Sequence, residues 1–381
     1  MVFGRESRFV DLHRSTWVEI DLNAIAYNIN TIKNKMPNHT KVIAVVKADG
    51  YGHGSIPVAK KALDSGAEAL AVALLEEALE LRDAGITAPI LVLGWVPPAS
   101  AIIAAEQNIT LTFFQQEWIQ QVNTYSFTKP LKLHLKLDSG MGRIGIRTEE
   151  ELHAILYALN KNSSIYLTGV YTHFATADEP ESTYFDVQKK RFERGLSLLQ
   201  DNWNGNLDIH IGNSASAIRL PEGMYNYIRF GIAMYGLYPS KAVKEQGDIE
   251  LKQAFSLHSQ LVHVKQIQAG DSISYGCTYT AKKEEWIGTI PIGYGDGWLR
   301  KMQGFSILIN GKRMPIVGRI CMDQTMVRLD RAYPVETKVT FIGHQNDAFI
   351  PMDEVSEYAE TINYEIPCVI NKRIPRIYKG L

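Results

Sequence analysis

The feature that most constrains the fold is a regular alternation of short apolar segments with amphipathic segments between about Lys41 and Ser240. Short runs rich in β-branched residues are typical of strands buried on both faces of a parallel sheet. Between them, runs such as SIPVAKKALDSG and LLEEALELRDAG have helical periodicity, and each ends at a glycine suited to the position after a helix. The predicted strands are Val42–Val46, Ala69–Val72, Ile90–Leu93, Ile109–Phe113, Leu131–Leu137, Tyr166–His173, Leu207–Gly212 and Tyr225–Gly231.

Eight strands separated by helices over roughly two hundred residues predict a (β/α)8 TIM-type barrel, an α/β fold with its active site at the C-terminal ends of the strands. An open, doubly wound sheet would give a similar alternation. However, the glycine-rich loop after the first strand lacks the GxGxxG fingerprint of a dinucleotide-binding fold. We therefore favour the barrel.

The first predicted strand runs directly into Lys47, which is followed by the glycine-rich loop ADGYGHG. An ammonium group at the end of a buried strand is partly desolvated, which lowers its pKa and favours the neutral, nucleophilic amine. A lysine that forms a Schiff base needs this property. The alternative is a lysine whose stem packs on the strand while its ammonium group reaches water. Position alone does not decide between these two interpretations.

Polar side chains also follow the other predicted strands. Lys136 lies on the fifth strand with Arg143 in the loop beyond it, and His173 ends the sixth. Taken singly, each has an ordinary explanation: a buried histidine with a hydrogen bond, a surface cation or a helix cap. Because all of them would meet at the functional rim of one barrel, a shared site is the better hypothesis. The seventh and eighth strands add Asn213, Ser214, Arg229 and Gly231.

Beyond about Ile249 the pattern changes to short strand-like runs separated by turns. The pair Asn310-Gly311 between FSILI and KRMPIV is a strong hairpin signal, and one helix is expected near Asp353 to Glu360. These runs predict a mostly β domain over residues 249–381, after a barrel domain over residues 1–248 whose first residues pack on the C-terminal domain. Tyrosines such as Tyr275 are ordinarily packing residues in a domain of this kind.

The composition excludes several classes of protein. The formal net charge is −1 without a long basic block, so the electrostatic footprint of a nucleic-acid-binding protein is missing. No apolar run has the length of a signal peptide or a membrane span. The three cysteines have no CxxC spacing, no metal-ligand spacing occurs, and free thiols in a reducing compartment are expected. We expect a cytoplasmic protein with neither a membrane nor a nucleic-acid partner.

Long motifs then resemble one enzyme family. AVVKADGYGHG is similar to the segment of alanine racemases that attaches pyridoxal 5'-phosphate, and the similarity continues through LKLDSGMGRIG, YTHFATADE, RFGIAMYGLYPS, SYGCTYTA, GRICMDQ and TINYEIPC. These motifs stand in the order and spacing of that family. One departure is Asp49-Gly50, where the family more often has Asn-Ala, and we expect it to loosen the loop rather than to abolish the chemistry. The resemblance implies a barrel, pyridoxal phosphate and alanine as the substrate.

The resemblance also implies roles for residues of the barrel. Lys47 would hold the cofactor as a Schiff base and act as one of two bases. Arg229 would face the pyridine nitrogen, and Arg143 would contact both the cofactor and the substrate carboxylate. A lysine at the position of Lys136 is often carbamylated in the family. The further residues implied to bind the cofactor are Tyr51, His173, Asn213, Ser214, Gly231, Ile232 and Tyr364.

The second base implied by the resemblance is Tyr275, contributed by the other subunit of a homodimer together with backbone near Met322. Racemisation needs bases on opposite faces of the reacting carbon. Tyrosine, with a pKa of about 10, needs nearby positive charge or hydrogen bonds to act at neutral pH. A chain from Tyr275 through His173 to Arg229 would supply them. An entry channel is implied to contain Asp178, Tyr294, Arg319 and Asp323.

The function implied by the resemblance is an alanine racemase that supplies D-alanine for peptidoglycan or serves alanine catabolism. Three other functions are alternatives to it. A related barrel decarboxylase would place an acid rather than Arg229 at the pyridine nitrogen. A non-catalytic pyridoxal-phosphate-binding barrel would lack the β domain and Tyr275. A racemase of another or broader range of amino acids, such as serine or lysine, is harder to distinguish by sequence.

Overall fold

The computed structural model describes residues 13–180 and 182–381, which divide into two compact units. One unit comprises residues 22–253, and the other combines the described N-terminal residues up to Asp21 with residues 254–380. The expectation that the first residues pack on the C-terminal domain falls largely on residues 1–12, outside the described residues. Each unit is described separately below.

The unit of residues 22–253 is a closed barrel of eight parallel strands, as predicted. Each strand pairs with the next along the chain, and β2 pairs with β9 to close the ring, with Val42 opposite Ile228. Most barrel positions are buried, which explains why β2, β3 and β4 read as nearly unbroken apolar runs. The strands are β2 (Lys41–Val45), β3 (Ala69–Val72), β4 (Ile90–Val92), β5 (Ile109–Phe113), β6 (Leu131–Lys136), β7 (Ile165–Tyr171), β8 (Asp208–Gly212) and β9 (Tyr227–Phe230).

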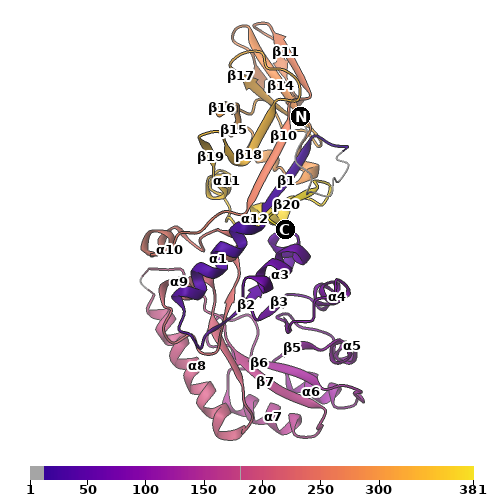
Figure 1. Ribbon diagram of the computed structural model, residues 1–381, viewed down its shortest axis with the longest axis vertical. Coiled ribbons are helices and arrows are strands. Elements are labelled where there is room, and N and C mark those ends of the chain that lie inside the picture. Colours follow the sequence, from indigo (N-terminus) through magenta and orange to yellow (C-terminus); the bar gives the residue numbers. More distant parts are fainter. Residues whose placement is uncertain (1–12, 181) are drawn as a thin grey trace. The chain divides into compact units, whose positions relative to one another are not determined.

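Helices between the strands cover the outside of the barrel, and Figure 1 shows α4 to α8 around the strands. Glycines end two of them as predicted: Gly66 follows α3 with φ +93°, and Gly85 follows α4 with φ +80°. The main helices are α1 (Leu22–Lys35), α3 (Ser55–Asp64), α4 (Leu75–Asp83), α5 (Ala101–Glu106), α6 (Gln116–Val122), α7 (Glu149–Leu159), α8 (Thr183–Asn202), α9 (Ser214–Arg219) and α10 (Lys241–Gln246).

The other unit is mostly β. Its main sheet has the order β16-β15-β18-β10-β1-β20, with β19 paired to β18, and a second sheet has the order β11-β14-β17. The first strand of the chain, β1, therefore lies between two strands from the C-terminal part. The bounds are β1 (Thr16–Asp21), β10 (Phe255–Gln260), β11 (His263–Ile267), β14 (Glu285–Ile290), β15 (Ser306–Ile309), β16 (Lys312–Pro315), β17 (Thr325–Leu329), β18 (Lys338–Gln345), β19 (Ala348–Ile350) and β20 (Arg376–Lys379).

Two local predictions for this unit concern a hairpin and a helix. The hairpin at Asn310-Gly311 is confirmed: it joins β15 to β16, and both turn residues have positive φ, +51° and +77°, as this tight turn requires. The helix expected near Asp353 to Glu360 is also confirmed, but this unit contains another. Besides α11 (Met352–Tyr358) there is a second, five-residue helix, α12 (Glu365–Val369), which is too short to show helical periodicity in the sequence.

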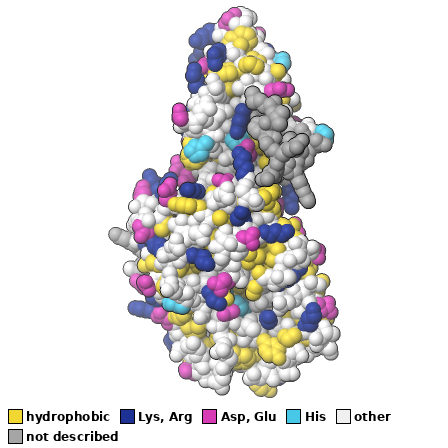
Figure 2. All heavy atoms as spheres, viewed as in Figure 1, with side chains coloured by type: hydrophobic (Ala, Val, Ile, Leu, Met, Phe, Trp, Pro, Cys, Tyr) yellow, Lys and Arg dark blue, Asp and Glu magenta, His cyan; other side chains and the backbone are white. Residues whose placement is uncertain are grey.

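The face shown in Figure 2 has no dominant charge. Figure 2 shows lysine and arginine side chains interspersed with aspartate and glutamate over the displayed face. Within residues 13–180 and 182–381, no helix has the length and apolar character needed to cross a membrane.

Candidate active site

The barrel brings most of the predicted site residues to one rim. Because all its strands are parallel, residues at their C-terminal ends share one end of the barrel. Lys47 follows β2, Lys136 is the last residue of β6, and His173 comes after β7. Asn213 and Ser214 follow β8, and Arg229 to Ile232 lie at the end of β9 and just beyond it.

The loop after Lys47 is a left-handed turn rather than an ordinary helix. In α2 (Lys47–Tyr51), Ala48, Asp49 and Tyr51 have φ of +52°, +53° and +53°, and the turn continues into Gly52. For residues other than glycine this conformation costs roughly 1–2 kcal/mol each. The turn therefore needs external support to hold the backbone next to Lys47 in one place.

Two carboxylates supply that support. Glu77 on α4 accepts hydrogen bonds from the backbone N–H of Ala48 at 2.6 Å through Oε1, and from Ala73 at 2.7 Å and Leu74 at 3.0 Å through Oε2. Asp49 accepts from the N–H of Ser55 at 2.9 Å. Hydrogen bonds from backbone N–H groups to ionised carboxylates are among the stronger ones in proteins.

The Asp49-Gly50 departure has a physical explanation. Gly50 has φ +61° and ψ +43°, a conformation that glycine adopts without the steric cost paid by alanine. Asp49 uses its carboxylate to tie the turn to the start of α3. Both residues are thus suited to the turn, so the expectation that they loosen it is not supported by its geometry.

The residues around Ser214 and Gly231 bring a hydroxyl and backbone N–H groups together. The Ser214 hydroxyl accepts from the N–H of Gly231 at 3.0 Å and of Ala233 at 3.4 Å, at the start of the 3-10 helix η2 (Ile232–Tyr235). A Cβ added to Gly231 would come within 2.9 Å of the Tyr51 hydroxyl. Lys47 Nζ lies 5.9 Å from the centre of the Tyr51 ring. The absence of a side chain at Gly231 therefore lets the Tyr51 hydroxyl approach the backbone beside Ser214. Hydroxyl and backbone N–H groups gathered in this way suit a phosphate group.

Arg229 is buried, and acceptors surround both of its Nη atoms. Its Nη1 donates to His210 Nδ1 at 2.8 Å and to His210 O at 2.7 Å, and its Nη2 donates to Thr172 O at 2.7 Å and His173 Nδ1 at 3.3 Å. Burial lowers the pKa of Arg229 to about 10, so it remains charged at neutral pH. Four of its five N–H groups are used in this way. The remaining Nε–H is available to a ligand acceptor.

This network fixes the protons on three histidines. Arginine can only donate, so Nδ1 of His210 accepts, and its Nε2–H donates to His134 Nδ1 at 2.9 Å. Burial, with a further contribution from Arg229, lowers the pKa of His134 to about 3 and that of His210 well below its usual value. His173 also accepts through Nδ1, and burial and Arg229 lower its pKa strongly. Neutral His173 therefore carries its proton on Nε2, as a donor.

Lys136 has an unusual environment. It is 2% exposed, and its Nζ has no hydrogen-bond partner among the described residues. Nζ lies 4.7 Å from the centre of the Tyr171 ring. Burial lowers its pKa well below the usual value, and Arg229 and Arg143 lower it further. This environment therefore favours the uncharged amine of Lys136 over the ammonium form.

The remaining predicted residues of the barrel unit occupy loops. Arg143 is exposed in the loop after β6. Asn213 caps α9, since its side chain accepts from the N–H of Ser216 at 3.0 Å. Asp178 lies between β7 and α8, and its carbonyl oxygen accepts from the Ser240 hydroxyl at 2.8 Å.

The mostly β unit brings together a second group. Tyr275, Tyr294, Arg300 and Ile320 line one open cavity of about 510 Å³, and Tyr275 is 69% exposed. The backbone of Met322 lies beside that of Tyr294, because the N–H of Gly295 donates to Met322 O at 2.9 Å.

The other predicted residues of this unit are not among the residues that line that cavity. Asp323 accepts from Arg373 at 2.7 Å. Arg319 lies against Gly276, next to Tyr275. Tyr364 precedes α12, and its part in binding phosphate stays a prediction.

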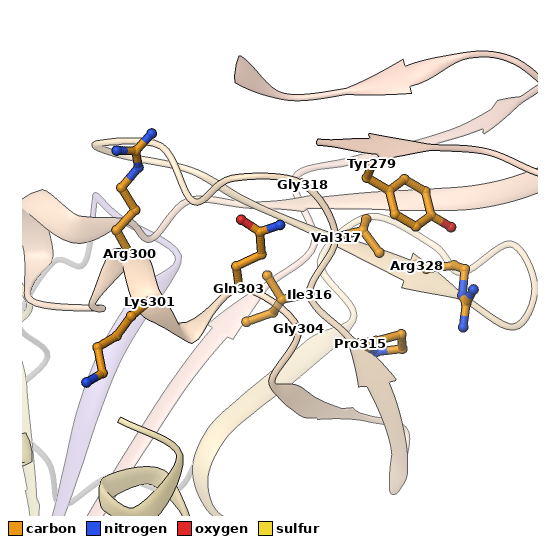
Figure 3. Close-up of a pocket in the computed structure, with 10 residues that line it drawn as sticks. All are labelled: Tyr279, Arg300, Lys301, Gln303, Gly304, Pro315, Ile316, Val317, Gly318 and Arg328. Carbon is orange, nitrogen blue, oxygen red and sulfur yellow. The ribbon is translucent and has the colours of Figure 1, made fainter. Parts of the chain in front are cut away.

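A second hollow in this unit, of about 610 Å³, lacks the features of a binding site. Its cationic side chains include Arg300, Lys301 and Arg328, and Figure 3 shows their charged ends pointing apart rather than toward a common centre. Lys301 pairs instead with Glu360. Among the residues that the structure describes, no group of three or more histidine, cysteine, aspartate or glutamate side chains could hold a metal ion.

Sequence reasoning missed several residues that support the site. Glu77 could have been noticed as an acidic residue in the first turn of a predicted helix. Its hydrogen bond with Ala48, however, joins that helix to the loop after β2, and the sequence gives no signal of this contact. His210 and His134 stand on predicted strands without any signal of their partnership with Arg229. Arg300, beside Tyr275 and Tyr294, had no motif to mark it.

Comparisons with known proteins give a consistent result. The alanine racemase N-terminal domain model matches residues 20–239, and the C-terminal domain model matches residues 254–378. The chain is 52% identical over 369 residues to the alanine racemase of Geobacillus stearothermophilus, covering 97% of this chain and 94% of that protein.

Solved structures agree with these matches. The structure of alanine racemase from Bacillus anthracis with bound L-Ala-P superposes with a TM-score of 0.95 at 50% identity, covering 97% of this chain and 96% of that one. Histidine racemase from Leuconostoc mesenteroides subsp. sake has a TM-score of 0.90 at 32% identity, covering 97% and 99%.

Proposed function

The chain belongs to the alanine racemase family, and we propose that it is a pyridoxal-phosphate-dependent alanine racemase that interconverts L-alanine and D-alanine. The observation that carries the proposal is the arrangement at one barrel rim. Lys47 lies beside Tyr51, whose hydroxyl approaches the backbone of Gly231, and the N–H of Gly231 donates to Ser214. These hydroxyl and N–H groups would hold a phosphate group, and Lys47 is the amine that would hold the cofactor covalently.

Pyridoxal phosphate, when bound, supplies the electron sink that makes the α-proton of an amino acid acidic enough for a side chain to remove. The residues present fit this cofactor. Tyr51, Ser214 and the N–H groups of Gly231 and Ile232 would hold its phosphate, joined by Tyr364. Arg229 would direct its free Nε–H at the pyridine nitrogen. Arg229 stays charged, so it would donate a hydrogen bond to that nitrogen without giving up its proton. The nitrogen would then remain unprotonated, which makes the cofactor a weaker electron sink and limits side reactions.

We infer that the two bases come from two subunits of a homodimer. Lys47, once released by the substrate, takes or returns the proton on one face. Tyr275, exposed on the mostly β unit, would do so on the other face in the partner subunit. The Nε2–H of neutral His173, held by Arg229, is the donor suited to stabilise the phenolate of Tyr275. Each subunit would then contribute to two equivalent sites.

Lys136 is proposed to carry a carbamate. The uncharged amine would form an N–C bond to CO2 and lose one proton to solvent, and the resulting carbamate anion would lie near the positive charges of Arg143 and Arg229. The carbamate would orient Arg143 toward the substrate carboxylate. Incubation with ¹³C-labelled bicarbonate should give a carbamate carbon signal that is absent from Lys136→Ala, and the same spectrum in both proteins would contradict this assignment.

The entry channel is proposed to include Asp178, Tyr294, Arg319 and Asp323, with Met322 backbone near the substrate. In the cell, the product D-alanine would supply peptidoglycan or the reaction would serve alanine catabolism, and we propose a cytoplasmic location. These roles follow from the family resemblance rather than from the geometry.

The activity is tested with purified protein loaded with pyridoxal phosphate. L-alanine, serine, lysine and histidine are supplied separately, and the D-isomers are quantified by chiral chromatography. We expect alanine to be racemised fastest and Lys47→Ala to be inactive in both directions. Faster turnover of another amino acid would replace the substrate assignment, and full activity of Lys47→Ala would contradict the proposed site.

A further inference from the structure

Tyr275 is presented by an unusually small hairpin. The strands β12 (Ser272–Ile273) and β13 (Tyr279–Thr280) have two residues each, and the 3-10 turn η3 (Tyr275–Cys277) forms the tip. Two-stranded hairpins are marginally stable alone, and this one has only two paired positions, Ser272 with Thr280 and Ile273 with Tyr279. A side chain that is 69% exposed at such a tip needs some other feature to fix its direction.

The residue before Tyr275 has a strained backbone. Ser274 has φ +66° and ψ −178°, a region that residues other than glycine essentially avoid. The two residues after Tyr275 also have positive φ, +73° at Gly276 and +47° at Cys277. Backbone strain of this kind costs on the order of 1–3 kcal/mol for a residue such as Ser274, and it persists only where neighbouring groups enforce it.

The Ser274 side chain provides that enforcement. Its hydroxyl donates to the carbonyl oxygen of Arg319 at 2.5 Å and lies 3.6 Å from Cys321 Sγ. The approach is close because Gly318 has no side chain: a Cβ there would lie 2.8 Å from both Ser274 Cβ and Ile273 O. Gly318 has φ +67°, which also favours glycine. The hairpin tip and the segment around Arg319 are therefore shaped to meet at Ser274.

The base of the hairpin is fixed independently of Ser274. The Tyr279 hydroxyl donates to the Glu285 carboxylate, and Ile273 belongs to a buried cluster with Val317, against which Tyr279 packs. Figure 3 shows Tyr279 next to Val317. Loss of the Ser274 hydroxyl would thus leave the hairpin attached but release the backbone that aims its tip.

We propose that Ser274 is a positioning residue for Tyr275: its hydroxyl bond to Arg319 holds the strained backbone that directs the phenol. The inference rests on the proposed role of Tyr275 as the second base. Because Ser274 acts through Tyr275, its loss should impair the proton transfer that Tyr275 performs and spare the one that Lys47 performs.

The test compares four variants of the full-length, cofactor-loaded enzyme. Ser274→Ala removes the hydroxyl and keeps Cβ, whereas Ser274→Gly removes both and also relieves the strain. Ser272→Ala is the matched control, since its hydroxyl pairs with Thr280 on the exposed side of the same hairpin. Tyr275→Phe gives the effect of losing the proposed base altogether. For each we would measure kcat, KM, the melting temperature and deuterium isotope effects with L- and D-alanine labelled at the α-carbon.

We expect kcat of Ser274→Ala to fall by about 10- to 100-fold in both directions, as displacement of a reacting group by about 1 Å does, with KM changing little. The isotope effect should rise with labelled L-alanine, whose proton Tyr275 would remove, and not with labelled D-alanine. Ser274→Gly should lose activity while keeping or raising the melting temperature. Ser272→Ala should remain within about twofold of the wild type, because general acid–base geometry is unaffected.

Three outcomes would overturn the proposal. Wild-type kcat in both Ser274 variants, with Tyr275→Phe impaired, would refute the positioning role alone. A loss of kcat that follows the melting temperature, with both isotope effects unchanged, would show a purely structural role. Full activity of Tyr275→Phe would refute the proposed second base and the role of Ser274 with it.

Discussion

Removal of the Glu77 carboxylate should disturb the Lys47 turn more than its surface position suggests. In the wild type it accepts three backbone N–H groups, from Ala48, Ala73 and Leu74. Hydrogen bonds to charged groups contribute about 1.5–3 kcal/mol each, but solvent reaches two of these three, so about 1 kcal/mol each is a better estimate. Their sum of about 3 kcal/mol is comparable with the cost of the three non-glycine residues in left-handed conformation, roughly 3–6 kcal/mol.

Glu77→Ala should therefore let the turn relax in the cofactor-free protein, and binding would have to restore it. A cost of about 1.4–3 kcal/mol corresponds to a roughly 10- to 100-fold weaker affinity for pyridoxal phosphate. Glu77→Gln, which keeps one acceptor oxygen, should fall in between. Absorbance titration of the apoenzyme with the cofactor measures this change.

Glu76→Ala is the matched control, because Glu76 is the exposed neighbour in the same first turn of α4. It should bind the cofactor like the wild type. Wild-type affinity and kcat in Glu77→Ala would refute the view that this carboxylate holds the turn.

Two further perturbations follow from the geometry of the barrel unit. Gly50→Ala should cost about 1–2 kcal/mol of folding stability because residue 50 has a left-handed backbone, which should lower the melting temperature by roughly 2–8 °C and reduce kcat. Gly85→Ala is the control: Gly85 also has positive φ but is far from Lys47 in the chain, so this variant should lose similar stability and keep its kcat. Equal kcat in both variants would contradict the reasoning. Acid should destabilise the barrel through His134, whose pKa of about 3 in the folded state lies below the unfolded value near 6.5. The stability of the fold is therefore fully present above pH 6.5 and decreases as the pH falls toward 3. The loss at pH 5 should be about 2 kcal/mol. Urea denaturation at pH 7.5 and 5 measures this loss, His134→Gln should reduce the difference, and an unchanged difference would show that other groups cause it.

The fold was predictable because the first barrel strands are buried on both faces and so appear as nearly unbroken apolar runs, as in Val42–Val46. The rim residues were predictable for the same reason, since Lys47, His173 and Arg229 interrupt the pattern where strands end. The supporting contacts were not. The three glycines after Lys47 indicate a tight turn, but its left-handed path through Ala48 and Tyr51 depends on Glu77, which lies on α4, distant in the sequence. Ser274 meets Arg319 only because separate strands bring them together.

We propose that one active site uses Lys47 from one subunit and Tyr275 from its partner. Mixing two inactive proteins tests this directly. Lys47→Ala and Tyr275→Phe would each be purified, mixed in equal amounts under conditions that exchange subunits, and assayed for D-alanine formation. Random exchange gives half mixed dimers, each with one intact site of two, so activity should return to about a quarter of the wild-type value. Mixing that restores no activity, although exchange of tagged subunits is observed, would show that Tyr275 acts within its own chain or is not the second base.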